Sequence, residues 1–175
     1  MPNQANLKVG QNFGLRLSKP TTEQIRTVEN DKTIRDTLTT ASLPLIFAQG
    51  CSISSNKNFV QTNNKETGIF ETNLITSIGL SIDVSSLVQD LSVEDATRVT
   101  TDELLALTLT TDFYFAVFGP TTLDAAGVPQ FVSGVKYYKT LVLFETDTID
   151  TPSHDLATAS FTLRSSGKIH YEANA

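Results

Sequence analysis

The stretch LTLTTDFYFAVF, residues 107–118, indicates the fold class of this 175-residue chain. Its odd positions carry the apolar side chains Leu107, Leu109, Phe113, Phe115 and Val117. A period of two residues is that of a strand with one buried face. Residues 78–84 alternate in the same way, with isoleucine, leucine, isoleucine and valine on one face. We therefore predict a strand at each place.

The composition extends this prediction to the whole chain. The sequence has 25 threonines, against two histidines, one cysteine and no tryptophan. β-Branched residues suit a pleated, half-buried surface. Further alternating runs occur between turns, and no internal repeat or linker divides the chain. We predict one all-β domain over residues 1–175, an antiparallel β-sandwich of jelly-roll type with about 8–10 strands. The side chains expected in its core are Leu80, Ile82, Phe113, Phe115, Leu141, Leu143 and Phe161.

Three segments depart from the strand period. Residues 1–6 are polar. Residues 22–38 fit a helix and two short polar strands about equally, and their threonines favour extended structure. Residues 85–107 change to helical spacing, with acids at 102 and 103 in a first helical turn. We predict a short helical insertion there, crossing one end of the sandwich.

Turn residues mark the expected strand ends. We predict loops or turns at residues 54–58, 63–65 and 123–129. Gly119-Pro120 is expected to end the strand that begins at residue 107, and Ser165-Ser166-Gly167 to turn a terminal hairpin. Residues 43–48, a continuous apolar run, predict a strand buried on both faces, with its proline near the start.

The chain has no basic-then-apolar leader at its N-terminus, and its longest apolar runs are about six residues. About 20 such residues are needed to span a bilayer. These features predict synthesis in the cytoplasm without a signal peptide or a membrane span. A domain of this size buries enough surface to fold without disulfides or metals. The single Cys51 is expected to be a small buried hydrophobe.

The net charge of −6 argues against direct binding of nucleic acid. Residues 1–88 carry a net +1 and residues 89–175 a net −7. This asymmetry is typical of acidic loops in solvent, and it also fits head-to-tail contact between copies of the chain. A basic N-terminal arm is absent from the sequence.

We identify no catalytic, cofactor-binding or metal-ligating residue, and we predict that the chain is not an enzyme. The two candidate bases are His154, in a polar connection, and His170, in the last strand, and both are expected to face solvent. Glu145 and Asp147 share a strand face and would hold Ca²⁺ with a third oxygen ligand, but no calcium-loop motif accompanies them. We expect a solvated acidic edge. Tyr114 is expected to face a partner, opposite the core-facing phenylalanines.

In length, strand count and polar N-terminal segment, the chain resembles the small single jelly-roll capsid or penton (vertex) proteins of icosahedral viruses and phages. The resemblance implies a non-enzymatic structural subunit of the virion that acts by self-assembly, with copies of itself and other virion proteins as partners. The missing basic arm differs from small RNA-virus coats and fits better a shell over a membrane or one filled by a packaging motor.

Two other classes remain open: a carbohydrate-binding or adhesin-type β-sandwich module, and an enzyme. Whether a small-molecule ligand binds is not indicated. If the chain assembles, we expect the contacts to come from residues 1–6, 21–40 and 146–155, because these polar segments contribute little to a core. Contacts between the basic residues of 8–35 and the acidic segment would weaken as salt is added.

Overall fold

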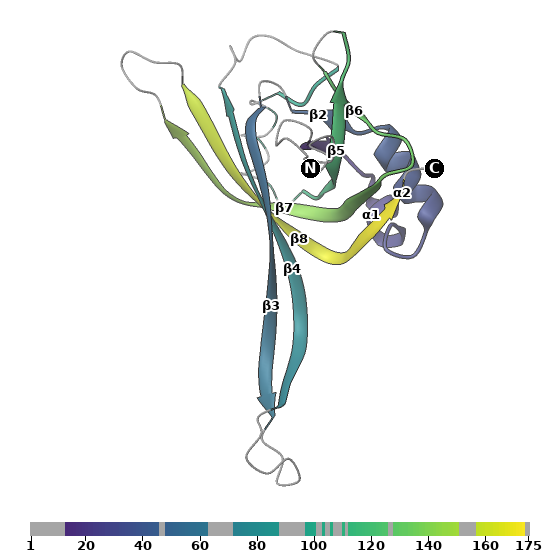
Figure 1. The fold of residues 1–175 in the computed structure, drawn as a ribbon, viewed down its shortest axis with the longest axis vertical. Coiled ribbons are helices and arrows are strands. Elements are labelled where there is room, and N and C mark those ends of the chain that lie inside the picture. The colour runs from purple at the N-terminus through teal and green to yellow at the C-terminus, as the bar shows by residue number, and fades with distance from the viewer. Residues whose placement is uncertain are drawn as a thin grey trace, which may run out of the picture.

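The computed structural model describes residues 13–45, 48–62, 72–87, 97–100, 103, 106, 110, 112–125, 128–150 and 157–173. Strands dominate these residues, and two short helices lie beside them (Figure 1). The elements are β1 (Phe13–Ser18), α1 (Thr22–Thr27), α2 (Lys32–Thr40), β2 (Leu43–Pro44), β3 (Ala48–Thr62), β4 (Thr72–Leu87), β5 (Tyr114–Leu123), β6 (Pro129–Phe131), β7 (Lys136–Asp150) and β8 (Thr158–Ala173).

One sheet contains all the described strands. Seven follow the order β2-β1-β5-β7-β8-β4-β3, and β6 pairs with β5 beyond that path. Every one of these pairings is antiparallel. The predicted all-β antiparallel class is confirmed. The predicted jelly-roll sandwich is not confirmed, because the pairing is continuous through one bent sheet instead of two separate ones (Figure 1).

Two hydrophobic cores lie on opposite faces of this sheet. The first is enclosed by the sheet's own curvature and includes Ile82, Val84, Ala116, Phe118 and Phe161. The second lies under the helices and includes Val28, Leu38, Phe115, Val117 and Tyr137. Five predicted core residues are buried, Leu80, Ile82, Phe115, Leu141 and Phe161. The other two, Phe113 and Leu143, are partly buried.

β5 is buried on both faces because a core lies on each side of it. Phe115 and Val117 point into the second core, and their neighbours in sequence point into the first. The prediction that Tyr114 faces a partner is therefore wrong, since its side chain belongs to the first core. A two-residue period shows which residues share a face, but it does not show that both faces are covered.

The segment 22–38 is helical, so its predicted extended structure is wrong. Thr21 and Gln24 form a reciprocal capping box at the start of α1, and the Asp31 carboxylate accepts from the Thr33 amide at the start of α2. Threonines of α2 donate their hydroxyls to carbonyls one turn earlier. Val28 and Leu38 are buried against the sheet, and this packing outweighs the weak helix propensity. The expectation that this segment contributes little to a core is therefore also wrong, because Val28 and Leu38 belong to the second core.

Several predicted strand ends are also wrong, because the strands are longer than expected. Residues 54–58 lie inside β3, and Gly119-Pro120 lies inside β5. The expected hairpin turn at residues 165–167 lies inside β8. There Gly167 has a positive φ of 91°, and the β7–β8 register shifts opposite it, between Lys139 and Leu141. Such a bulge bends a strand without ending it.

The remaining boundaries are partly described. Of the predicted insertion, residues 85–87 are the end of β4, while Glu103 and Ala106 are helical. Thr100 and Glu103 cap this helical turn reciprocally. Residues 88–96 lie outside the described residues, as do residues 1–6 and 63–65. In the predicted strand over 43–48, β2 ends at Pro44, and Leu45 forms an isolated parallel bridge with Val99.

Candidate assembly surface

The sheet has a long free edge on each side of its four-strand part β7-β8-β4-β3. β3 pairs with β4 over almost its whole length, and no other described strand pairs with it. On the opposite side, the β5–β7 pairing ends at Val142. Residues 143–150 of β7 therefore pair with β8 and with no second described strand. Free edges expose unpaired main-chain N–H and C=O groups, which are a template for pairing with another chain.

A two-stranded arm projects from the body of the molecule (Figure 1). We define the β3–β4 arm as residues 55–62 of β3 and 72–80 of β4, which pair with each other. β4 joins β8 from Ser81 onward, so the arm has no third strand. Nine extended residues at about 3.3 Å each give it a length of roughly 30 Å.

The arm exposes five large apolar side chains: Phe59, Val60, Leu74, Ile75 and Ile78, each 50–58% exposed. Its described residues contain one charge, that of Lys57. Edge strands of monomeric proteins are usually protected by charges, prolines or bulges. This arm has one bulge, between Asn58 and Phe59, and its apolar surface faces outward. A surface of this kind is expected to contact another molecule.

The apolar face of β4 continues from the first core out onto the arm. Val84, Ile82 and Leu80 are 3%, 1% and 6% exposed, whereas Ile78, the next residue on that face, is 52% exposed. Across the strand pair, Ile78 lies opposite Lys57, and Ile75 lies opposite Phe59. Cross-strand partners share a face. The apolar alternation of β4 therefore continues beyond the buried part of the sheet and onto the exposed arm.

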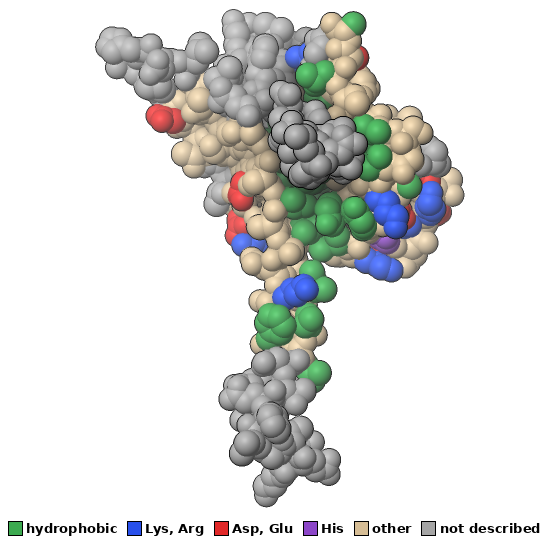
Figure 2. Space-filling model, viewed as in Figure 1, with side chains coloured by type: hydrophobic (Ala, Val, Ile, Leu, Met, Phe, Trp, Pro, Cys, Tyr) green, Lys and Arg blue, Asp and Glu red, His purple; other side chains and the backbone are tan. Residues whose placement is uncertain are grey.

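A second exposed patch is the pair Tyr138 and Tyr171, which we call the tyrosine pair. The two ring centroids are 4.7 Å apart, and the Lys136 ammonium lies 5.8 Å from the Tyr171 centroid. Tyr138 is opposite Phe118 of the first core, so the pair lies on the first core's face of the sheet. Hydrophobic side chains gather over β7 and β8 and continue along the upper part of the arm (Figure 2).

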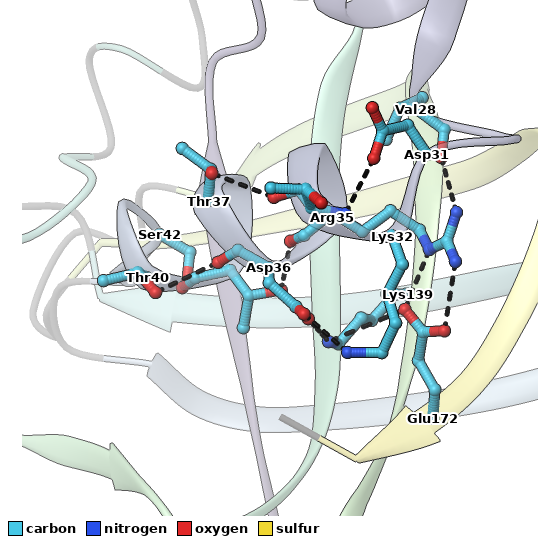
Figure 3. A network of polar contacts seen from close by, with 12 residues as sticks. Val28, Asp31, Lys32, Arg35, Asp36, Thr37, Thr40, Ser42, Lys139 and Glu172 are labelled. Atoms are coloured by element: carbon cyan, nitrogen blue, oxygen red, sulfur yellow. Dashed lines mark hydrogen bonds and ion pairs between the residues drawn. The ribbon is translucent and has the colours of Figure 1, made fainter. Parts of the chain in front are cut away.

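A network of charged groups fixes the helices to the other face of the sheet (Figure 3). Arg35 of α2 forms a two-pronged ion pair with Glu172 of β8, with donor–acceptor distances of 2.8 and 3.2 Å. Lys139 of β7 is fully buried, and its ammonium lies 3.1 Å from Asp36 and 3.8 Å from Glu172. Lys32 also pairs with Asp36. A buried ammonium is tolerated here because two carboxylates face it.

Three groups of this network have displaced pKa values. Burial opposes the charge of Asp36, but hydrogen bonds from Lys32 and Lys139 outweigh it and hold its pKa below the ordinary value. The hydrogen bonds from Arg35 lower the pKa of Glu172. Burial, aided by Arg35, lowers the pKa of His170. The Nε2 atom of His170 is buried without a described hydrogen-bond partner, so its prediction as a solvent-facing residue is wrong.

We expect the folded state to lose stability as the pH falls. Folding lowers the pKa of His170 below its ordinary value of 6.5. As the pH falls below about 6.5, the unfolded chain therefore takes up a proton more readily than the folded chain, and the folded state loses stability. The carboxylates have folded pKa values below their ordinary 3.8 and 4.5, so their contribution is present above those values and is lost as they protonate. Urea unfolding at pH 7.5, 5.5 and 4.0 should show decreasing midpoints. A His170→Asn variant should lose less between pH 7.5 and 5.5, and equal midpoints at all three pH values would contradict this account.

Of the other residues that the sequence singled out, the structure describes the side chains of Cys51 and Glu145. Cys51 is partly buried beside the first core, and burial, with the charge of Asp83 adding to it, raises the pKa of its thiol to about 12. Glu145 forms an exposed ion pair with Arg164. Within the described part of the chain, no three His, Cys, Asp or Glu side chains are grouped as a metal would require. His154 lies outside that part.

No helix among the described residues is long and apolar enough to cross a membrane. The expected contact segment 146–155 overlaps the free edge of β7, but the sequence analysis did not identify the β3 edge or the arm, although one signal was present. Residues 48–62 and 72–80 together contain a single charged residue, Lys57, whereas the long strands β7 and β8 carry several.

Comparison with solved structures places this fold among the proteins of tailed particles. A chain in the tail of an empty gene transfer agent particle, refined helically with C6 symmetry, aligns with a TM-score of 0.59 at 12% identity, covering 95% of this chain and all of that one. A chain of the SPP1 tail tube aligns with a TM-score of 0.60 at 9% identity, covering 95% of this chain and 80% of that one. A chain of the anti-feeding prophage baseplate gives 0.53 at 12% identity, covering 96% and 97%. The chain has the fold of these tail and baseplate proteins. No protein-family model and no curated protein sequence matches it.

Proposed function

We propose that the chain is a non-enzymatic structural subunit of a phage-type tail tube, in which copies join edge to edge into rings. The observation that carries the proposal is the four-strand part β7-β8-β4-β3 with its two free edges. The likeness to chains of a gene transfer agent tail and a phage tail tube supports a tail component over the capsid or penton protein that the sequence suggested.

The strand directions suit this contact. Three successive antiparallel pairings make β7 antiparallel to β3 within one copy. A rotation about the ring axis places the β7 edge of the next copy beside β3 of the first copy. These two strands are then also antiparallel. The hydrogen-bond pattern of the sheet then continues across the contact unchanged. The two edges are different surfaces, so the contact is head-to-tail and can close into a ring.

The width of the sheet gives the size of such a ring. Four strands at about 4.8 Å each contribute roughly 19 Å of wall per copy. With six copies, the symmetry reported for the gene transfer agent tail, the wall would have a perimeter of about 115 Å and a radius of about 18 Å before strand tilt widens it. Light scattering and negative-stain electron microscopy of the purified chain should show rings or tubes. A monomer at every concentration and salt would contradict the proposal and favour the binding-module alternative.

We expect charge on the β3 edge to control assembly. Glu145 and Asp150 make the β7 edge acidic, although Glu145 is already paired with Arg164. In a Ser54→Glu/Asn56→Glu double variant, two new carboxylates would face this edge in the neighbouring copy. Like charges across strands cost about 0.2–1 kcal/mol each, so the assembly concentration should rise about tenfold.

The matched control is Ser54→Lys/Asn56→Lys, which changes the same exposed positions with the opposite charge. It should assemble at least as well as the unmodified chain at low salt. Sedimentation across a concentration series measures both variants, and circular dichroism checks that both are folded. Equal weakening by glutamate and lysine would show that the β3 edge does not meet the acidic β7 edge.

A further inference from the structure

We propose that the β3–β4 arm of one copy docks on the tyrosine pair of a second copy. This inference rests on the proposed function, and it names the surface that receives the arm. The arm is apolar, extended and exposed, and the tyrosine pair is an exposed aromatic group on the same face of the sheet, where the described Ile149 is exposed as well.

The occupant must come from outside the chain that carries the arm. In the folded chain Tyr138 and Tyr171 remain 38% and 57% exposed, and the arm's apolar side chains are at least half exposed. The described part of the chain thus leaves both patches uncovered. Each copy offers one arm and one tyrosine pair, and these are different surfaces. Every arm meets a tyrosine pair either in a closed head-to-tail assembly or by reciprocal exchange in a two-fold dimer, and the proposed ring selects the head-to-tail arrangement.

The chemistry of the two surfaces is complementary. Aromatic residues at the centre of an interface contribute much of its binding energy, and aliphatic side chains pack well on their rings. The arm presents Ile75 and Ile78 on the face that continues the core, where Lys57 lies beside them. Lys136 already lies over Tyr171, which leaves the Tyr138 ring to the arm's lysine as a cation–π partner. The described residues of the arm and the two tyrosines include no carboxylate, so neither surface itself brings an acid to the contact.

The arm is also long enough to reach a neighbouring molecule. At roughly 30 Å, it extends over a distance close to the width of a small domain. Its apolar residues are distributed from Ile78 near the body to Phe59 and Val60 farther out. The docking uses one face of the arm, on a neighbouring copy within the assembly, and leaves residues 48–54 of β3 and 143–150 of β7 for edge-to-edge ring closure.

Cross-linking between two differently marked chains tests this proposal. In a Cys51→Ser background, Phe59→Cys is made in one chain and Lys136→Cys, beside the intact tyrosine pair, in a second, epitope-tagged chain. The chains are mixed, assembled and treated with a short bismaleimide. The Phe59→Cys chain mixed with a Leu123→Cys chain is the matched control, because Leu123 is 59% exposed and lies outside the tyrosine pair. We expect the 59–136 heterodimer to exceed the control at least fivefold.

A second measurement does not depend on introduced thiols. Tyr171→Ala removes an exposed ring, so the monomer should keep its unfolding midpoint while the assembly concentration rises about tenfold or more. Leu123→Ala should leave that concentration within about twofold. Assemblies that form without the 59–136 cross-link would overturn the docking and leave edge-to-edge ring formation standing. A chain that stays monomeric under all conditions would overturn both.

Discussion

Phe115→Ala should lower the free energy of unfolding by about 3–5 kcal/mol. The Phe115 side chain is 1% exposed and packs in the second core, between β5 and the helices. Truncation removes its transfer free energy and leaves a cavity that helices anchored by ion pairs cannot easily fill. Because this core fixes α1 and α2 to the sheet, the loss should appear in a single cooperative transition.

Guanidinium unfolding followed by far-UV circular dichroism measures the change. Phe59→Ala is the matched control: the same substitution on the arm, at a side chain 58% exposed, should change the free energy of unfolding by less than about 0.5 kcal/mol. A loss below about 1 kcal/mol for Phe115→Ala would mean that the helices are not packed over β5 in solution.

Glu172→Ala should cost about 3 kcal/mol of folding free energy. The substitution removes the ion-pair partner of Arg35, whose side chain is 8% exposed, and the second carboxylate facing the fully buried Lys139. Two cations would then be left near each other with Asp36 as the remaining ion-pair partner of Lys139. Removal of one partner from a buried pair costs 3–5 kcal/mol, and the 20% exposure of Glu172 places the expected value near the lower end.

Glu145→Ala is the control, because its ion pair with Arg164 is 38% and 63% exposed at its two side chains. It should cost less than about 1 kcal/mol. Adding Lys139→Met to Glu172→Ala should recover part of the loss, since the buried ammonium is then gone. Additive losses in the double variant would show that Lys139 and Glu172 do not interact energetically.

The strand pattern was predictable wherever a segment has one buried face. In β4, the alternation of Leu80, Ile82 and Val84 predicted the buried side chains correctly. The same rule misjudged Tyr114, because the curvature of the sheet closes the first core over the face that alternation assigned to a partner. Long-range packing of this kind leaves no signal in a local period.

The helices and the bulge were missed for a different reason. Local propensity in residues 22–38 was balanced, and the burial of Val28 and Leu38 on a distant strand decided between helix and strand. At Gly167 the dipeptide signals of a turn were present, but pairing with β7 on both sides of the glycine made it a bulge inside one strand. Sequence signals of chain reversal and of a bulge are the same, since both need a residue that accepts positive φ.

The sequence by itself determined that the protein is an antiparallel all-β chain, because the two-residue apolar period and β-branched composition are local properties of strands. It also determined that histidine and cysteine, which often act in catalysis or bind metals, are scarce. Tertiary structure alone decided which strands end the sheet, where the arm leaves the body and which apolar side chains stay uncovered. These depend on pairings between residues far apart in the chain, such as Ser81 with Arg164, and the free energy of such contacts is absent from any single segment.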